Sequence, residues 1–136
     1  MSVELARVAA DQGFAVAPDE AYFRDLAACG MLFAHWAREY AGDAAILSSR
    51  GNRSFAELNG NANRLLRHLR HSGLAAGSPV AILCGNIPQL IESVLACQRG
   101  GFRFTPVNWH LGPEEVAYIL GDCAAEAWIV QAEFAD

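Results

Sequence analysis

Two histidines and three arginines are the first side chains in this sequence whose spacing could support chemistry. His68 and His71 lie three residues apart on one predicted helix, so they could share a metal ion. No acidic or cysteine partner lies near them in sequence, which favours an exposed polar stripe. Arg64, Arg67 and Arg70 make the same helix locally basic and could contact a phosphate. Because the chain as a whole is acidic, with a formal net charge of -5, we expect a solvated face there instead.

A pair of acids and one asparagine are the next candidates. Glu114 and Glu115 could act as acid and base, but they stand in the first turn of a predicted helix. Carboxylates at that position complement the positive end of the helix dipole, and this is the role that we expect. Asn86 follows a buried strand, where α/β sheets bind ligands. It also stands where a helix cap belongs, and we favour the cap.

The tryptophans are a further group with two interpretations. Trp36, Trp109 and Trp128 could stack on a ligand, but we expect them to pack in a core or an interface. The first of them belongs to a predicted helical face whose members recur at spacings of four, three and four residues, namely Cys29, Phe33, Trp36 and Tyr40. Gly42 is expected to end that helix.

The composition excludes several reaction types. All 10 basic residues are arginine, so no lysine is present to form a Schiff base, bind phosphate or act as a general acid or base. The motifs G-x-x-x-x-G-K-[ST], G-x-G-x-x-G, G-x-S-x-G and H-E-x-x-H are also missing from the sequence. We therefore predict no catalytic, cofactor-binding or metal-binding residue in this chain.

The same numbers favour one globular domain without a membrane span. The chain has 136 residues, of which 53% are hydrophobic and 18% charged, enough to bury a core. Its acidity argues against nucleic acid and anionic membranes as general partners. The apolar stretch at 77–91 is interrupted by proline and glycine, and the N-terminus resembles no secretory signal. We expect a cytoplasmic protein with four small buried thiols, at Cys29, Cys84, Cys97 and Cys123.

Helices and strands alternate from Phe55 onward, after a short strand and a hairpin arm. The predicted strands are 44–48, 80–84, 102–107 and 127–130, with 53–55 as a hairpin arm. The predicted helices are 55–72, 88–99 and 113–123. Alternation of this kind predicts right-handed βαβ units and an α/β fold with a partial, doubly wound, mainly parallel sheet and flanking helices.

The helix at 55–72 carries the strongest local signals. Ser54 and Glu57 form a capping-box pair at its start, and Gly73 closes it. Its expected apolar face is Phe55, Leu58, Ala62, Leu65, Leu66 and Leu69. Its expected polar stripe is Glu57, Asn61, Arg64, His68 and His71.

Three blocks of the sequence resemble a known enzyme family. The first is SFAEL at 54–58 with NRL at 63–65 and GLAAG at 73–77, and the second is VAIL at 80–83 with Asn86. The third is GG at 100–101, PVNW at 106–109 and EVAYIL at 115–120. In order and spacing, residues 31–136 resemble the N-terminal segment of an acyl-CoA synthetase of the fatty-acid–CoA ligase type, within the adenylate-forming, AMP-binding superfamily. The PVNW stretch also resembles the fatty-acyl and aryl CoA-ligase branch more than the peptide-synthetase branch.

The resemblance implies a two-step reaction for a longer parent enzyme. A carboxylic acid, fatty or aryl, attacks ATP to give an acyl-adenylate and pyrophosphate, and the thiol of CoA then displaces AMP. ATP, Mg²⁺ and CoA are implied for that parent, but the residues that bind them lie further along such chains. We expect none to be bound by this segment, and we expect the segment alone to be catalytically inactive.

The resemblance covers residues 31–136 only, the alanine-rich residues 1–30 resemble no family, and alternatives stay open. Residues 1–30 are expected to form an N-terminal helical extension, and residues 31–136 an incomplete α/β subdomain of the large domain. The leading hypothesis is a truncated piece of a ligase. A stand-alone, non-catalytic interaction or dimerisation module is the alternative, with an exposed sheet edge that could form a homo-oligomer. An unrelated doubly wound domain of the flavodoxin or response-regulator type is the third.

Overall fold

Three parallel strands form the central sheet of the protein, whose computed structural model describes residues 19–135. The strands are β3 (Pro79–Leu83), β4 (Arg103–Pro106) and β5 (Ala127–Val130), in the order β4-β3-β5. Both neighbours run parallel to β3. The parallel α/β sheet predicted from sequence is therefore confirmed, and the strand at 127–130 has the predicted bounds.

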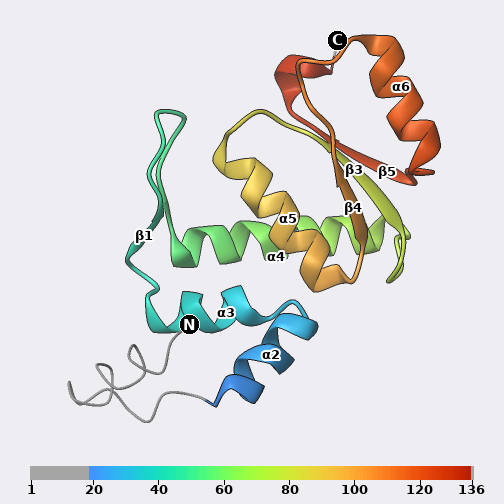
Figure 1. The fold of residues 1–136 in the computed structure, drawn as a ribbon. Coiled ribbons are helices and arrows are strands. Elements are labelled where there is room, and N and C mark those ends of the chain that lie inside the picture. The colour runs from blue at the N-terminus through green and yellow to red at the C-terminus, as the bar shows by residue number, and fades with distance from the viewer. Residues whose placement is uncertain (1–18, 136) are drawn as a thin grey trace.

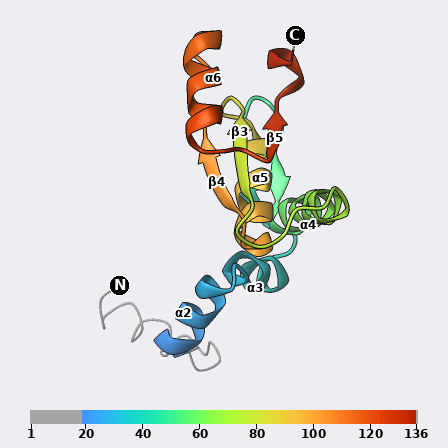
Figure 2. The same cartoon turned by 90° about the vertical axis from the view of Figure 1, so that its right-hand side faces the viewer.

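Helices cover both faces of this sheet (Figures 1 and 2). They are α4 (Phe55–His71) and α5 (Pro88–Gly100) on one face and α6 (Pro113–Asp122) on the other. Successive side chains of a strand point to opposite faces. Accordingly Val80 and Ile82 pack into the cluster under α4 and α5, whereas Ala81 packs against residues of α6. This two-sided cover is the doubly wound arrangement that the alternation predicted.

A short antiparallel hairpin precedes α4. It consists of β1 (Ala44–Ile46) and β2 (Arg53–Ser54). Ser54 then caps α4: its hydroxyl oxygen accepts from the Glu57 N–H at 3.2 Å, and the Glu57 carboxylate accepts from the Ser54 N–H at 2.8 Å. The predicted capping box is confirmed at both of its hydrogen bonds.

The N-terminal helices correct one prediction. The helical face predicted to run from Cys29 to Tyr40 is not continuous, because the chain forms two helices there, α2 (Glu20–Ala28) and α3 (Leu32–Glu39). Cys29 is the exposed C-cap residue of α2. Gly30 separates the helices with a φ of +69°, and a Cβ there would lie 2.5 Å from the Gln98 carbonyl oxygen. Gly30 therefore allows the chain to turn and, because it has no side chain, to pack closely against α5. Of the predicted extension 1–30, residues 1–18 lie outside the described residues.

The start of α5 corrects a second prediction. Asn86 is exposed and is not the cap, because the N-cap is Ile87, which makes no side-chain cap hydrogen bond. Pro88 follows as the first helical residue. A residue before proline is disfavoured in helical conformation, so Ile87 takes an extended backbone and must be the boundary. At the other end Gly101 has a φ of +69° and closes the helix, as expected.

None of the helices within residues 19–135 is both long and apolar enough to cross a bilayer.

Candidate functional site

The candidate site lies at the carboxyl ends of the sheet strands. The chain leaves β3 toward α5 on one face of the sheet, and it leaves β4 toward α6 on the other face. Neighbouring strands whose connections diverge in this way leave a crevice between the two loops, and ligands of α/β sheets bind at such points. Two hollows flank the end of β3, one toward β4 and one toward β5.

The hollow between β3 and β4, called here the switch-point crevice, measures about 460 Å³. The loop after β3 contributes Asn86, and the loop after β4 contributes Trp109 and His110. The Trp109 ring stacks on Phe134, with ring centroids 5.6 Å apart and an angle of 11° between the planes. The imidazole of His110 lies against the Trp109 ring, with centroids 3.6 Å apart. Trp109 is therefore packed among aromatic rings at the crevice wall. Asn86, which the sequence also allowed as a ligand-binding residue, lines the same crevice.

The hollow between β3 and β5, called here the Glu92 cavity, measures about 550 Å³. Its walls are an apolar set and a polar set. The apolar set comprises Leu65, Cys84, Ile87, Ile129, Val130 and Ala132. The polar set comprises Arg50, Gln89, Glu92, Ser93, Gln131 and Glu133. These residues come from the hairpin loop, α4, the loop after β3, α5, the end of β5 and the 3-10 turn that follows it (Ala132–Phe134).

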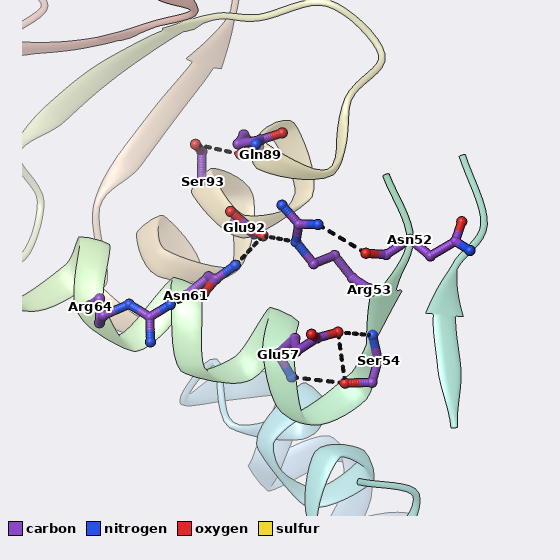
Figure 3. Close-up of polar contacts among 9 residues, drawn as sticks. All are labelled: Asn52, Arg53, Ser54, Glu57, Asn61, Arg64, Gln89, Glu92 and Ser93. Atoms are coloured by element: carbon purple, nitrogen blue, oxygen red, sulfur yellow. Dashed lines mark hydrogen bonds and ion pairs between the residues drawn. The ribbon is translucent and has the colours of Figure 1, made fainter. Parts of the chain in front are cut away.

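A buried carboxylate joins three of these elements (Figure 3). Glu92 on α5 accepts from Arg53 Nε at 3.0 Å and from Asn61 Nδ2 at 2.5 Å, both on its Oε1 atom. Arg64 in turn donates to the Asn61 side-chain oxygen. The Glu92 side chain is only 9% exposed, so this ion pair is shielded from solvent and fastens the base of the hairpin to α4 and α5.

Sequence reasoning missed this contact. The helix at 88–99 was interpreted by its apolar residues alone, although Glu92 stands inside that run and a buried acid requires a partner. Asn61 was assigned to the exposed stripe of α4, yet it is half-buried because it faces α5. The unpaired acid in an apolar run was the available signal, but nothing local identified Arg53 as its partner.

A second polar chain lines the rim of the Glu92 cavity. The Gly85 N–H donates to Gln131 Oε1 at 3.0 Å, and Gln131 Nε2 donates to Glu133 Oε2 at 2.8 Å. Arg50 of the hairpin loop also donates to Glu133, at 3.2 Å. The side chains of Arg50 and Glu133 are 58% and 59% exposed, so this outer ion pair is open to water.

The remaining predicted site residues lie apart from both hollows. His68 and His71 are exposed on α4, and the His71 Nδ1 lies 2.7 Å from the Arg67 carbonyl oxygen. Glu114 and Glu115 lie in the first turn of α6, as expected, and Glu115 also accepts from the Gly112 N–H at 2.9 Å. Within residues 19–135 no group of three His, Cys, Asp or Glu side chains could hold a metal ion.

The tryptophans and cysteines follow the expected packing only in part. Trp36 stacks on Phe23 and on Tyr40, whereas Trp128 on β5 is 57% exposed and belongs to no core. Cys84 and Cys97 are buried, and burial raises the pKa of the Cys97 thiol to about 11. Burial also raises the pKa of Cys84, partly offset by its hydrogen bond with Gln131.

The cysteine prediction is wrong at Cys29, which is exposed because it caps the short helix α2.

A comparison of the sequence with protein families identifies one of them. Residues 33–136 match the family described as "AMP-binding enzyme". The match covers the hairpin, all three sheet strands and both hollows at their carboxyl ends.

Two curated relatives illustrate the range within that family. An indoleacetate–CoA ligase of Aromatoleum aromaticum is 34% identical over 108 residues, which cover 76% of this chain and 21% of the relative. A plipastatin synthase of Bacillus subtilis is 35% identical over 88 residues, covering 65% of this chain and 2% of the relative. The chain thus spans about a fifth of the length of the first relative and far less of the second.

Solved structures agree on the fold. A fatty acyl CoA synthetase of Mycobacterium tuberculosis superimposes with a TM-score of 0.74 at 26% identity, and the match covers 82% of this chain and 22% of that one. Relatives of more than one subtype therefore share this segment.

Proposed function

This chain belongs to the AMP-binding enzyme family, and we propose that it is the N-terminal segment of an ATP-dependent carboxylic acid–CoA ligase. The parent reaction joins the acid to AMP with release of pyrophosphate, and CoA then displaces AMP to give the thioester. The observation that carries this proposal is the 34% identity over 108 residues with an indoleacetate–CoA ligase. The ordered blocks at 54–58, 80–86 and 106–120 support it from the sequence.

An aryl or fatty acid is the substrate class that we propose. The PVNW stretch at 106–109 supports a CoA ligase over a peptide synthetase. The names of an indoleacetate–CoA ligase and of a fatty acyl CoA synthetase among the similar proteins agree with that branch. Aminoacyl-adenylate formation, the activity expected of the peptide-synthetase branch, is the outcome that would contradict it.

Within the parent, we assign this segment a supporting role rather than a chemical one. The described residues hold no group of three ligating side chains for Mg²⁺, and the sequence has no lysine to stabilise developing negative charge. The residues present therefore do not fit the metal site that the reaction needs, and we derive no step through it. In this proposal residues 31–136 form the subdomain that backs the active site, and the extension predicted for residues 1–30 precedes it.

The test uses the full-length protein that carries this segment. ATP–pyrophosphate exchange is measured with a panel of aryl acids, fatty acids and amino acids, followed by detection of the CoA thioester. We expect exchange that depends on an aryl or fatty acid, and thioester formation when CoA is added. Exchange with amino acids alone would overturn the substrate class, and no exchange with any acid would overturn the ligase.

The 136-residue chain by itself is expected to give no exchange. Circular dichroism of the same sample checks that it is folded, so that inactivity is not a trivial result of unfolding. Acid-dependent exchange by this chain would contradict the proposed supporting role.

A non-catalytic interaction module is the second candidate. Within residues 19–135, β5 pairs only with β3, and its Trp128 side chain is 57% exposed. An open strand edge beside an exposed aromatic is a surface on which a second copy could dock. Size-exclusion chromatography at increasing concentration tests this, because a monomer throughout would contradict it. For either candidate we propose the cytoplasm, which the free thiols of the described cysteines support.

A further inference from the structure

The Glu92 cavity contains a buried carboxylate of which only one oxygen accepts hydrogen bonds from the described residues. Both donors that reach Glu92, Arg53 and Asn61, bind the same oxygen, Oε1. None of the hydrogen bonds among residues 19–135 involves its Oε2 atom, which Figure 3 shows turned away from both donors. A carboxylate can accept about four hydrogen bonds. Oε2 is therefore an acceptor without a protein donor among the described residues. It belongs to a side chain that is nine-tenths buried and lines the cavity.

The charges around the cavity cancel in pairs. The Arg53 guanidinium neutralises Glu92 at 3.0 Å, and Arg50 neutralises Glu133 at 3.2 Å on the rim. A cationic ligand therefore finds no excess negative charge, and an anionic ligand finds no free arginine. An uncharged molecule fits this balance best, because desolvating a net charge would not be compensated.

The size and the other walls define the rest of the ligand. A volume of about 550 Å³ lies in the range of small-molecule sites. The apolar wall consists of Leu65, Ile87 and Ile129. The hydroxyl of Ser93 donates to the Gln89 carbonyl oxygen at 2.7 Å, so it is not available as a donor to a ligand. Of the two lining carboxylates, Glu92 is the one shielded from solvent, and its Oε2 atom is left to orient a ligand.

From this arrangement we propose that the Glu92 cavity is a binding site for an uncharged small molecule with an apolar body and one hydroxyl or amide N–H. The donor of the ligand binds Glu92 Oε2, and its apolar body packs on the wall formed by α4, α5 and β5. The Glu92 cavity shares Cys84 with the switch-point crevice, and the proposal does not depend on the ligase activity.

The first test compares two probes of which only one has a hydrogen-bond donor. Benzyl alcohol carries the donor, and benzyl methyl ether has a similar body without it. The readout is the rate at which N-ethylmaleimide labels Cys84, which lines the Glu92 cavity and also the switch-point crevice, so the Glu92 substitution below assigns the protection to the cavity. Cys97, fully buried in the core, is the internal control, because residues 71–99 contain both thiols without an internal arginine or lysine and form one tryptic peptide.

In the full-length protein, benzyl alcohol is expected to slow labelling of Cys84 by a factor of 1 plus its concentration divided by its Kd. This factor is about two when the concentration equals Kd. Benzyl methyl ether is expected to protect less at the same concentration. Equal protection by both probes would overturn recognition by Glu92. An absence of protection, or the same change at Cys84 and Cys97, would overturn the site.

A substitution provides the second test. In Glu92→Gln the amide oxygen can keep Arg53 and Asn61, which turns the amide NH₂ toward the cavity. The acceptor then becomes a donor, so the preference for the alcohol over the ether should vanish or reverse. Glu114→Gln on α6, an exposed residue that lines neither hollow, is the matched control and should leave the preference unchanged. An unchanged preference in Glu92→Gln would contradict the proposal, and the two-probe comparison in the unsubstituted protein stands even if this variant fails to fold.

Discussion

On the face of the sheet covered by α4 and α5, the described residues form a core cluster of ten buried side chains, whereas under α6 the buried cluster has three. The first face includes Val80, Ile82 and the helix side chains that meet them. On the second face, Tyr118 of α6 is 73% exposed, and Trp128 of β5 is 57% exposed beside Ala81. The difference indicates that the stability of this segment resides mainly on the α4/α5 face.

The largest expected effect comes from removing one side chain on each face of the same strand. Ile82→Ala should lower the free energy of unfolding by about 3 to 4 kcal/mol, because Ile82 is 1% exposed in the larger core. Leu83→Ala, on the α6 side, should cost about half of that, because Leu83 is only partly buried. Urea denaturation of the 136-residue chain measures both. Equal losses would remove the distinction between the faces.

The polar contacts repeat the contrast between buried and exposed. Glu92→Ala should cost about 3 kcal/mol, because it leaves the half-buried Arg53 without its partner. Glu133→Ala on the exposed rim should cost less than about 1 kcal/mol. The two variants are compared by denaturation at low and high salt. A loss at Glu92 as small as the loss at Glu133 would mean that the inner ion pair does not hold the hairpin.

The N-terminal caps of α4 and α6 differ, and a single substitution at either helix would make them alike. α4 begins with a reciprocal capping box, but α6 begins at Gly112, which has no side chain, so only the Glu115 half of the box exists there. Ser54→Ala should cost about 1 kcal/mol. Gly112→Ser should stabilise by a few tenths of a kcal/mol, since a Cβ there meets only Glu115 Oε2, at 3.7 Å. Thermal melts decide between gain and loss, and a lower Tm for Gly112→Ser would refute the incomplete cap.

The smallest effect is a dependence on pH at the start of α4. Hydrogen bonds from the Ser54 backbone N–H and then from its hydroxyl lower the pKa of the Glu57 carboxyl below 4.5. A lowered pKa in the folded state means that the contribution to stability is present above pH 4.5 and is lost as the pH falls through the lower folded value.

The Tm difference between the unsubstituted chain and Glu57→Ala should therefore shrink below pH 4.5. In a Ser54→Ala background the same comparison should change less with pH but should not become flat, because the backbone N–H of residue 54 still donates to Glu57. A difference that stays constant from about pH 7 to about pH 3 would show that Glu57 is not held in its ionised form.

The local features of the fold could be predicted because their determinants lie within a few residues of one another. The Ser54–Glu57 cap, the closing Gly101 and the strand at 127–130 all depend on short-range spacing. The misplaced cap at Asn86 was also a local question: the restriction that Pro88 places on Ile87 decides it, and that restriction is visible in the sequence.

The two hollows could not be predicted in the same way. Arg53 and Asn61 lie 39 and 31 residues from Glu92, and Arg50 lies 83 residues from Glu133. At such separations the partner of a buried charge depends on how the hairpin, α4 and α5 pack, and no spacing rule carries that information. The exposure of Cys29 and Trp128 likewise follows from where the chain turns and which strand stands at the edge.

By itself, the sequence determined the order of strands and helices, the parallel sheet, the caps and the family resemblance, because periodicity and capping act between near neighbours. Tertiary structure alone decided which carboxylate is buried, which oxygen of it stays unused, and which face of the sheet remains thinly covered. Those properties arise when distant segments exclude water from the same place, and burial of that kind is a property of the packed chain rather than of any stretch of it.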